Sequence, residues 1–526
     1  MFGDSVFAER PFAALEDIYL YVDASSSVVA DFEYVIYVGT RWFATSPTDT
    51  PPNRPFRGTL LEPLNFRRSI LGSTMGVYST GDGRLVIDNA DAYYDNLIQL
   101  YGVDGRDITI KVGRTTDAYV DRPIIFKGTA ADWNVNEQTV SFALRDFSYK
   151  LNVPAQPNLY GGTGGSDGGS DLAKKRKPRA FGYVRNITPA FVVPSLLIYQ
   201  VHDGAVNDVS AVYDRGTALT RGSDYATYAL LAAATISAGQ YGTSLAEGFF
   251  KLGSQPAGTV TADVQGDGGD SNFRYTTGDI VRQLISSTTS LVDPTDLNTT
   301  SFTNLNTTQP AAVGYYLGPD ATETVADVIA NLMGGIGGWG GFRRDGTFEV
   351  KIFTAPSGNA EATYTRLDII DLVREPLPDG TIPPWRQRVP YQRAWTVQTD
   401  LAGSVSASHK AFVADPFRLA EASNTTIKID HPFARDPEPV QAYFDAQADA
   451  ETEATRLLNL YKTVRALYRM KLPRRALTLD LGDPIQVTYP RWDLSTGRLM
   501  RVVEINENLS PPSPGTIDYV EVVAYG

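Results

Sequence analysis

The side chains that most enzymes use for catalysis are scarce in this sequence. It contains no cysteine and only three histidines, His202, His409 and His431, which lie far apart along the chain. A zinc site of the HExxH type or a histidine-based triad needs such groups in a defined arrangement. His202 precedes Asp203, but a turn at a strand end explains this pair better than a catalytic dyad does. We predict no catalytic residues and no metal site.

One glycine-rich segment matches a nucleotide-binding motif in form only. Gly335, Gly337 and Gly340 satisfy the pattern GxGxxG, which holds phosphates where a strand ends and a helix begins. Here a predicted helix precedes the glycines and a predicted strand follows them. We interpret the segment as a helix end followed by a close-packed loop. Since there is also no Walker-type GxxxxGK[ST] motif, we expect no cofactor.

Acidic residues are abundant, and their number alone identifies no site. Among 60 aspartates and glutamates, many pairs could act as the two carboxylates of a glycosidase, which must stand ~5 to 9 Å apart. Asp88, Asn89, Asp91 and Asp95 cluster in the sequence, but they lack the glycine and the terminal glutamate of a calcium loop. Turn formation explains this cluster, so no acidic residue is assigned to a site.

Length and composition describe a large folded protein. The chain has 526 residues, of which 42% are hydrophobic and 20% charged, as in ordinary globular proteins with several domains. The net charge of −13 disfavours a surface that grips nucleic acid, whereas an acidic wall would let DNA pass without sticking. Asp4, Glu9 and Arg10 interrupt any apolar run of a signal peptide. We therefore expect synthesis and assembly in the cytoplasm.

Hydrophobic patterning predicts a mainly β chain with a mixed α+β middle and small β-barrel or sandwich domains at both ends. Period-two strand patterns fill residues 1–155, where residues 124–135 and 139–147 read as a hairpin. Residues 436–526 begin with a helix predicted over residues 439–463 and continue as strands. This pattern gives one β-barrel-like unit near each terminus.

Three further regions separate these ends. Residues 156–180 are rich in glycine and serine and then basic, so we expect a flexible linker or loop whose basic side chains are solvated; the basic residues are Lys174, Lys175, Arg176, Lys177 and Arg179. Residues 181–270 read as a β-rich domain and residues 271–435 as an α+β domain. In the latter we predict a helix capped by Thr276 or Thr277, a helix over residues 322–333 capped by Thr322, and a hairpin turning at residues 344–346.

Four segments resemble tail proteins encoded in the tail-tip gene clusters of siphophages and of the phage-like gene transfer agents of α-proteobacteria. Residues 83–113 follow a pattern of glycine, strand, Asn, Asp, short helix, Gly-Arg, strand and glycine. Residues 177–219, 256–266 and 479–505 are similar to further segments of these proteins. The chain is thus identified by resemblance as a baseplate or tail-tip hub protein.

The resemblance implies a structural component of the virion that is not an enzyme. It implies a homotrimer whose barrels rest on the ring of distal tail protein, close the tail tube, anchor fibre or tip proteins and form the channel for genome ejection. The partners would be the distal tail protein, the tape measure protein, other baseplate and fibre subunits, and phage DNA in transit. A fused lysozyme or peptidase, which some hubs carry, is not evident here.

Two alternative functions remain open. A receptor- or carbohydrate-binding tail protein could stack sugars on exposed aromatic residues such as Trp42, Trp339, Trp385, Trp395 and Trp492. Tryptophan lies more often in cores or interfaces, and such fibres usually contain repeats or coiled-coil heptads, which are not seen here. The third possibility, a tail-associated hydrolase, would need one essential carboxylate pair.

Overall fold

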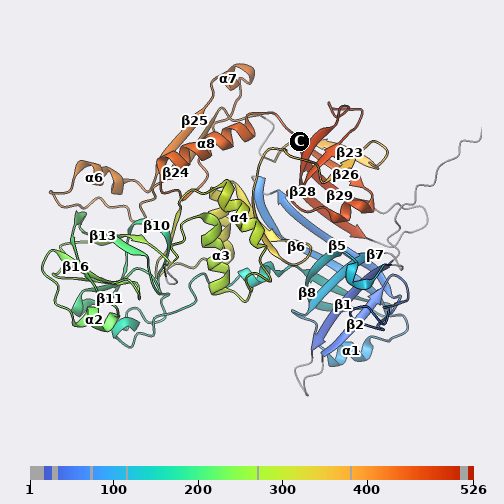
Figure 1. Cartoon of the computed structure of the whole chain (residues 1–526), viewed down its shortest axis with the longest axis horizontal. Coiled ribbons are helices and arrows are strands. Elements are labelled where there is room, and N and C mark those ends of the chain that lie inside the picture. Colours follow the sequence, from blue (N-terminus) through green and yellow to red (C-terminus); the bar gives the residue numbers. More distant parts are fainter. Residues whose placement is uncertain are drawn as a thin grey trace, which may run out of the picture.

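The computed structural model describes residues 17–25, 33–71, 75–113, 117–268, 272–378, 382–509 and 519–526. Most of its regular structure is β, in agreement with the mainly β class expected from the sequence. One large sheet occupies one end of the molecule, a separate β region occupies the other, and helices α3 and α4 lie between them (Figure 1). Asp4, Glu9 and Arg10 lie outside the described residues.

The large sheet contains strands from both ends of the chain. Its path runs in the order β2, β1, β7, β8, β9, β6, β5, β28, β29, β26 and β23, and β27 pairs with both β28 and β22. The N-terminal strands are β1 (Asp17–Ser25), β2 (Glu33–Gly39), β5 (Leu60–Leu71), β6 (Met75–Asp88), β7 (Asp107–Gly113), β8 (Ile124–Val135) and β9 (Thr139–Arg145). The later strands are β22 (Ala362–Tyr364), β23 (Asp371–Glu375), β26 (Leu467–Leu472), β27 (Pro484–Val487), β28 (Arg498–Leu509) and β29 (Tyr519–Tyr525).

The two terminal β-units are joined where β5 pairs with β28. This pairing is antiparallel and extends from Leu64 opposite Leu509 to Ser69 opposite Glu504. Among the described strands, the path has β2 at one end and β23 at the other, so it closes no barrel. The expected barrels at the two ends are therefore corrected to one shared sheet, because β5 and β28 hydrogen-bond to each other and not to strands that would close separate units.

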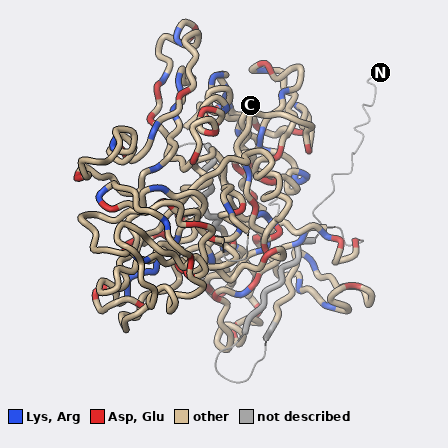
Figure 2. The backbone as a smooth tube through the Cα atoms, turned by 60° about the vertical axis from the view of Figure 1, so that its left-hand side comes forward, with Lys and Arg blue, Asp and Glu red and all other residues tan. Residues whose placement is uncertain are grey.

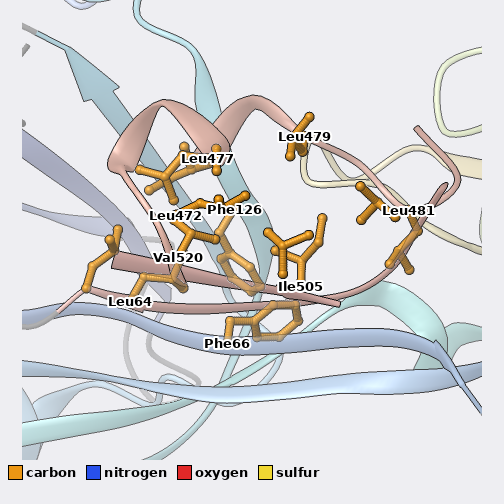
Figure 3. Close-up of a cluster of buried hydrophobic side chains, with 14 of the residues drawn as sticks. Leu64, Phe66, Phe126, Leu472, Leu477, Leu479, Leu481, Ile505 and Val520 are labelled. Carbon is orange, nitrogen blue, oxygen red and sulfur yellow. The ribbon is translucent and has the colours of Figure 1, made fainter. Parts of the chain in front are cut away.

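We call the pairing of β5 with β28 the seam. One apolar core packs against it from strands of both ends of the chain. Figure 3 shows Leu64 and Phe66 of β5 and Phe126 of β8 packed with Ile505 of β28 and Val520 of β29. Leucines that precede β27 complete the cluster, and all of these side chains are buried. Since burying a large apolar side chain stabilises a fold by ~1.5 to 3 kcal/mol, neither terminal unit completes its core alone.

The second β region consists of two five-stranded sheets. The first has the order β14 (Thr217–Ala218), β13 (Asp208–Asp214), β18 (Val260–Gln265), β10 (Arg179–Ile187) and β19 (Gly314–Leu317). The second has the order β11 (Ala190–Val193), β12 (Ile198–Gln200), β17 (Phe249–Leu252), β16 (Gln240–Ser244) and β15 (Thr220–Asp224). A short helix, α2 (Tyr228–Ala233), contacts the second sheet.

Two helices that the sequence predicts form the middle of the molecule together with α4 (Thr299–Thr308). The first, α3 (Thr277–Thr288), is capped by Thr276, whose side-chain oxygen accepts a hydrogen bond from the Asp279 N–H at 3.3 Å. The second, α5 (Val325–Gly335), begins later than expected. Thr324, and not Thr322, is its cap, because Thr324 and Asp327 form a reciprocal capping box.

The region around α8 (Gln447–Tyr461) differs from the expected helix over residues 439–463. The preceding residues are extended, and Phe444 forms isolated β-bridges with Val313 and Tyr391. Phe444 is buried there, so tertiary pairing replaces the first helical turns. Strands β24 (Arg386–Tyr391) and β25 (Arg418–Ser423) pair antiparallel, and β25 leads to α7 (Thr426–Asp430). The segment between the two strands contains α6 (Ala407–Ala414), which lies to one side (Figure 1).

Residues 156–180 form a packed loop. Tyr160 and Leu172 are buried, and the backbones of Tyr160 and Lys174 are hydrogen-bonded at 2.8 Å. The Gln156 side chain donates to the carbonyl oxygens of Lys177, Leu317 and Gly318. These contacts correct the expectation of a flexible linker, because two apolar anchors fix a segment whose composition alone suggests mobility. No helix in the described parts of the chain is both long and apolar enough to cross a membrane.

Candidate functional site

The three histidines lie in different parts of the fold. His202 is 3% exposed, and its Nδ1 accepts a hydrogen bond from the Ala180 backbone N–H at 3.0 Å. Burial, and after it the charge of Arg179, lowers the pKa of His202 to about 3, so this ring is neutral and structural. His409 stacks on Tyr213, and His431 follows α7. Among the described residues, no group of three His, Asp or Glu side chains could hold a metal ion.

The glycine-rich segment lies between a helix and a strand, as predicted. Gly335 ends α5, Gly337 has a φ of +60°, and β20 (Gly338–Phe342) follows. A Cβ atom at Gly340 would lie 2.7 Å from the ring of Phe348 on the paired strand β21 (Phe348–Ile352). Close packing of this hairpin accounts for the motif, and its turn contains Gly346 with a φ of +80°, as an Asp-Gly turn requires.

The acidic cluster near residue 90 forms a turn, as predicted. Asn89 Oδ1 accepts a hydrogen bond from the Tyr94 N–H at 2.9 Å, and Asn89 Nδ2 donates to Asp95 Oδ1 at 2.8 Å. Asp91 Oδ1 accepts from the Tyr93 N–H at 3.2 Å. These side chains therefore hold the backbone that leads into α1 (Asp95–Leu100).

The basic run of residues 174–179 makes contacts within the fold. Arg179 is 7% exposed and donates to the Ala155 carbonyl oxygen at 3.0 Å and to Thr288 Oγ1 at 2.8 Å. Arg176 donates to the Gln156 carbonyl oxygen at 2.8 Å. Lys175 and Lys177 pair with Asp320 and Asp167. The expected solvation thus holds for the exposed lysines and is wrong for Arg179. Figure 2 likewise shows basic and acidic positions intermixed over the visible fold.

The five tryptophans considered for sugar stacking have different environments. Trp339 is buried, and Trp395 stacks on Tyr443 with 6.2 Å between ring centroids. Lys428 Nζ lies 3.4 Å from the ring centroid of Trp385, while Trp492 stacks on Tyr489. Trp42, by contrast, is 68% exposed. Only this one of the five is therefore both highly exposed and next to a sizeable cleft in the described residues.

A group of charged side chains, several of them buried, lies at the seam between β5 and β28. Arg67 and Arg68 are adjacent on β5, so their side chains point to opposite faces of the sheet. Glu504 and Glu507 are three residues apart on β28 and therefore also face opposite ways. Arg67 pairs with Glu504 at 2.7 Å, and Arg68 pairs with Glu507 at 3.3 Å. The seam is consequently fastened by ion pairs on both of its faces.

One face carries what we call the Asp480 junction, made of Arg68, Arg343, Arg344, Asp480 and Glu507. Asp480 Oδ1 lies 2.8 Å from Arg68 Nη1, and its Oδ2 lies 3.1 Å from Arg344 Nη2 and 3.4 Å from Arg343 Nη2. Arg68 belongs to the N-terminal strands, Arg343 and Arg344 to the turn of the β20–β21 hairpin, and Asp480 to the C-terminal region. One carboxylate thus connects three parts of the chain.

Burial and charge oppose each other in this junction. Burial alone would raise the pKa of Asp480, but Arg68, Arg344 and Arg343 lower it to about 2. The same burial raises the pKa of Glu507, which Arg68 offsets only in part. A cavity of about 10 Å³ remains beside Arg68 and Asp480, room for about one water molecule. The junction is therefore a packed structural site and not a pocket for a ligand.

The opposite face carries what we call the Glu504 ladder, which crosses five neighbouring strands. Glu504 lies 2.7 Å from Arg67 on β5 and 3.5 Å from Arg469 on β26. Arg469 also pairs with Glu521 of β29 at 2.7 Å and with Glu375 of β23 at 2.8 Å. These contacts raise the pKa of Arg469, mainly through the hydrogen bond to Glu375. The ladder ties the strands on both sides of the seam to one another.

Comparisons with known proteins give similar solved structures. The chain is similar to the tail protein from Neisseria meningitidis MC58, with 11% identity, a TM-score of 0.41, and 96% of this chain and 97% of that chain covered. It is similar to the 43 kDa tail protein of prophage MuSo2 from Shewanella oneidensis, with 10% identity, a TM-score of 0.36, and coverage of 97% and 96%. It is also similar to prophage tail protein gp18 from Listeria monocytogenes EGD-e, with 10% identity, a TM-score of 0.31, and 97% of this chain and 94% of that chain covered. All three are tail proteins. No protein-family model matches the chain, and no curated protein does.

Proposed function

We propose that this chain is a structural, non-enzymatic hub of the tip of a long non-contractile phage tail. The observation that carries the proposal is the way the fold brings together the segments that resemble tail-tip proteins. Residues 83–113 supply the end of β6 together with α1 and β7, and residues 479–505 supply β27 and most of β28. Strand β5 pairs with both β6 and β28, so two segments remote in sequence share one sheet.

The other two resembling segments also meet. Residues 177–219 contain β10 and β13, and residues 256–266 contain β18. Strand β18 pairs antiparallel with β10 and with β13. Independent segments that resemble one class of protein therefore form the centres of two sheets. This arrangement supports a resemblance of the whole architecture, which single short motifs could not support.

A hub must hold its domains in fixed relative positions while force is transmitted along the tail. The Asp480 junction suits this role, since it connects the N-terminal strands, the middle hairpin and the C-terminal region through buried ion pairs. Breaking a buried pair by removing one partner costs ~3 to 5 kcal/mol. Three copies in a closed ring would add buried interface without disulfides, in a chain that contains no cysteine.

In the proposed assembly, the hub contacts the distal tail protein, the tape measure protein and fibre subunits, and it encloses the channel through which DNA leaves. A reconstruction of intact particles without imposed symmetry tests this. We expect three copies of the chain around the tail axis at the tip, with the large sheets facing the tail tube. A chain found elsewhere in the particle, or in one or six copies, would contradict the proposal.

The non-enzymatic part of the proposal has its own assay. The purified full chain is expected to release no product from peptidoglycan, from surface polysaccharide or from nucleotides. A tail-associated hydrolase would instead show turnover that disappears when one carboxylate pair is replaced by the corresponding amides. Turnover of that kind would replace the structural hub with a catalytic one.

A further inference from the structure

An open cleft lies beside the N-terminal strands, away from the seam. Its volume is about 700 Å³, which is in the range of small-molecule binding sites. We call it the Trp42 cleft. Its walls come from β2, from the segment around β4 (Pro55–Phe56), and from the turn that precedes α1. The side chains relevant to binding are Tyr37, Trp42, Arg54, Arg57, Tyr93 and Tyr94.

Two aromatic rings are presented to solvent at this cleft. Trp42 is 68% exposed and Tyr93 is 47% exposed, although burial of such rings is strongly favourable. The backbone under Trp42 is closely packed, because a Cβ atom at Gly58 would lie 2.7 Å from the Trp42 backbone nitrogen. The hydrogen bond from the Tyr93 N–H to Asp91 fixes the other ring's backbone. The exposed rings thus stand on a supported framework.

A small aromatic core supports the cleft from below. Phe56 is fully buried and meets Tyr37 edge to face, with 5.1 Å between ring centroids. Tyr119 packs on Phe56 at 5.3 Å. Tyr94 is buried beside the cleft, and its hydroxyl forms a hydrogen bond of 2.9 Å with Thr59 Oγ1. These contacts preorganise the wall, so a ligand would not need to order it on binding.

The cleft also carries an excess of positive charge. The Arg57 guanidinium lies 3.6 Å from the ring centroid of Tyr93, and Arg57 Nη2 donates to Asp91 Oδ2 at 2.7 Å. Arg57 Nε and Nη1 have no hydrogen-bond partner among the described residues. Arg54 is exposed, with its guanidinium 5.6 Å from the ring centroid of Tyr37. The two arginines carry two positive charges, and Asp91 supplies one negative charge. The net positive charge therefore favours an anionic group in the cleft.

We propose that the Trp42 cleft binds an acidic saccharide. The C–H bonds on the face of a sugar ring carry partial positive charge and fit the negative face of an aromatic ring, here that of the exposed Trp42. The carboxylate of the sugar accepts hydrogen bonds from Arg54, in the field of Arg57. A nucleic acid fits less well, because it requires several phosphate contacts and this chain carries a net charge of −13. The site does not depend on the hub role.

Titration calorimetry of the full chain with hexagalacturonate, an acidic sugar probe, and with neutral maltohexaose tests the proposal. Hexagalacturonate is expected to bind, and maltohexaose is expected to bind at least about tenfold more weakly. Trp42→Ala should weaken hexagalacturonate binding about tenfold, as the loss of one stacking contact predicts, and Arg54→Gln should weaken it and reduce its dependence on salt. Phe433→Ala provides the matched control, since Phe433 is 83% exposed and lies outside the cleft.

Several outcomes would overturn the acidic-saccharide site. These are no binding of hexagalacturonate at millimolar concentration, equal binding of both sugars, or equal losses in Trp42→Ala and Phe433→Ala. Tighter, Trp42-dependent binding of a thymidine oligonucleotide would replace it with a single-stranded nucleic-acid site. Circular dichroism of each variant checks that the fold is retained. Because no particle is involved, these results are separate from the test of the hub role.

Discussion

Replacement of Asp480 by asparagine is the most direct test of the Asp480 junction. Asp480 is 5% exposed, and the three arginines hold its pKa at about 2, below the ordinary value of 3.8. Because the folded pKa is lowered, the charged carboxylate stabilises the fold above the unfolded pKa, and this contribution is lost as the pH falls through the folded pKa. At ~1.4 kcal/mol per pKa unit, the difference corresponds to roughly 2.5 kcal/mol near neutral pH.

The assay is urea unfolding of the full chain, followed by tryptophan fluorescence, because Trp339 lines the small cavity beside Asp480. Asp480→Asn should lower the free energy of unfolding by roughly 2 to 3 kcal/mol at about pH 7 and by about half as much at about pH 3. The matched control is Asp400→Asn, since the Asp400 side chain is 78% exposed and pairs with Arg215; it should cost at most ~1 kcal/mol. Equal losses at both pH values, or a loss no larger than the control's, would refute the reasoning.

Three further predictions concern single elements. Burial raises the pKa of Glu507, so the charged form that pairs with Arg68 carries a burial cost; the stability of the natural chain relative to Glu507→Gln should fall as the pH rises, which urea midpoints at about pH 5 and about pH 8 would measure. Thr324→Ala should destabilise α5 by ~1 kcal/mol in thermal unfolding because it removes the cap, whereas Thr322→Ala should change little. Limited trypsin digestion followed by mass spectrometry should show slow cleavage after both Lys174 and Arg179, because the Lys174 backbone is hydrogen-bonded within the packed loop and Arg179 is buried.

Local features of the fold were predictable from the sequence. The stripe of Ile280, Val281, Leu284 and Ile285 is buried on α3, since a spacing of three and four residues defines one helix face. The hairpin turn at Gly346 followed from an Asp-Gly pair. Errors occurred where several local signals competed, as at α5, where the two threonines Thr322 and Thr324 could not be ranked before the contact with Asp327 was known.

The seam was not predictable, because nothing local in the sequence relates β5 to β28. Arg68 and Glu507 are 439 residues apart, and each belongs to a strand that would read equally well within a separate barrel. The same limit applies to the Trp42 cleft. Nothing in the sequence ranked the five of its six tryptophans that were considered for sugar stacking, and only tertiary packing buries Trp339 while it leaves Trp42 exposed.

The shared sheet also constrains how the chain folds. Strand β5 is made early in synthesis, yet its partner β28 follows hundreds of residues later, and contacts between such distant segments form slowly because a long loop must close first. Until then, the edge of β5 and the apolar side chains of Leu64 and Phe66 lack the partners that cover them in the complete fold. An uncovered apolar edge invites pairing with another chain. Arg67 and Arg68 place a charge on each face of this edge, which opposes such pairing until Glu504 and Glu507 arrive to neutralise them.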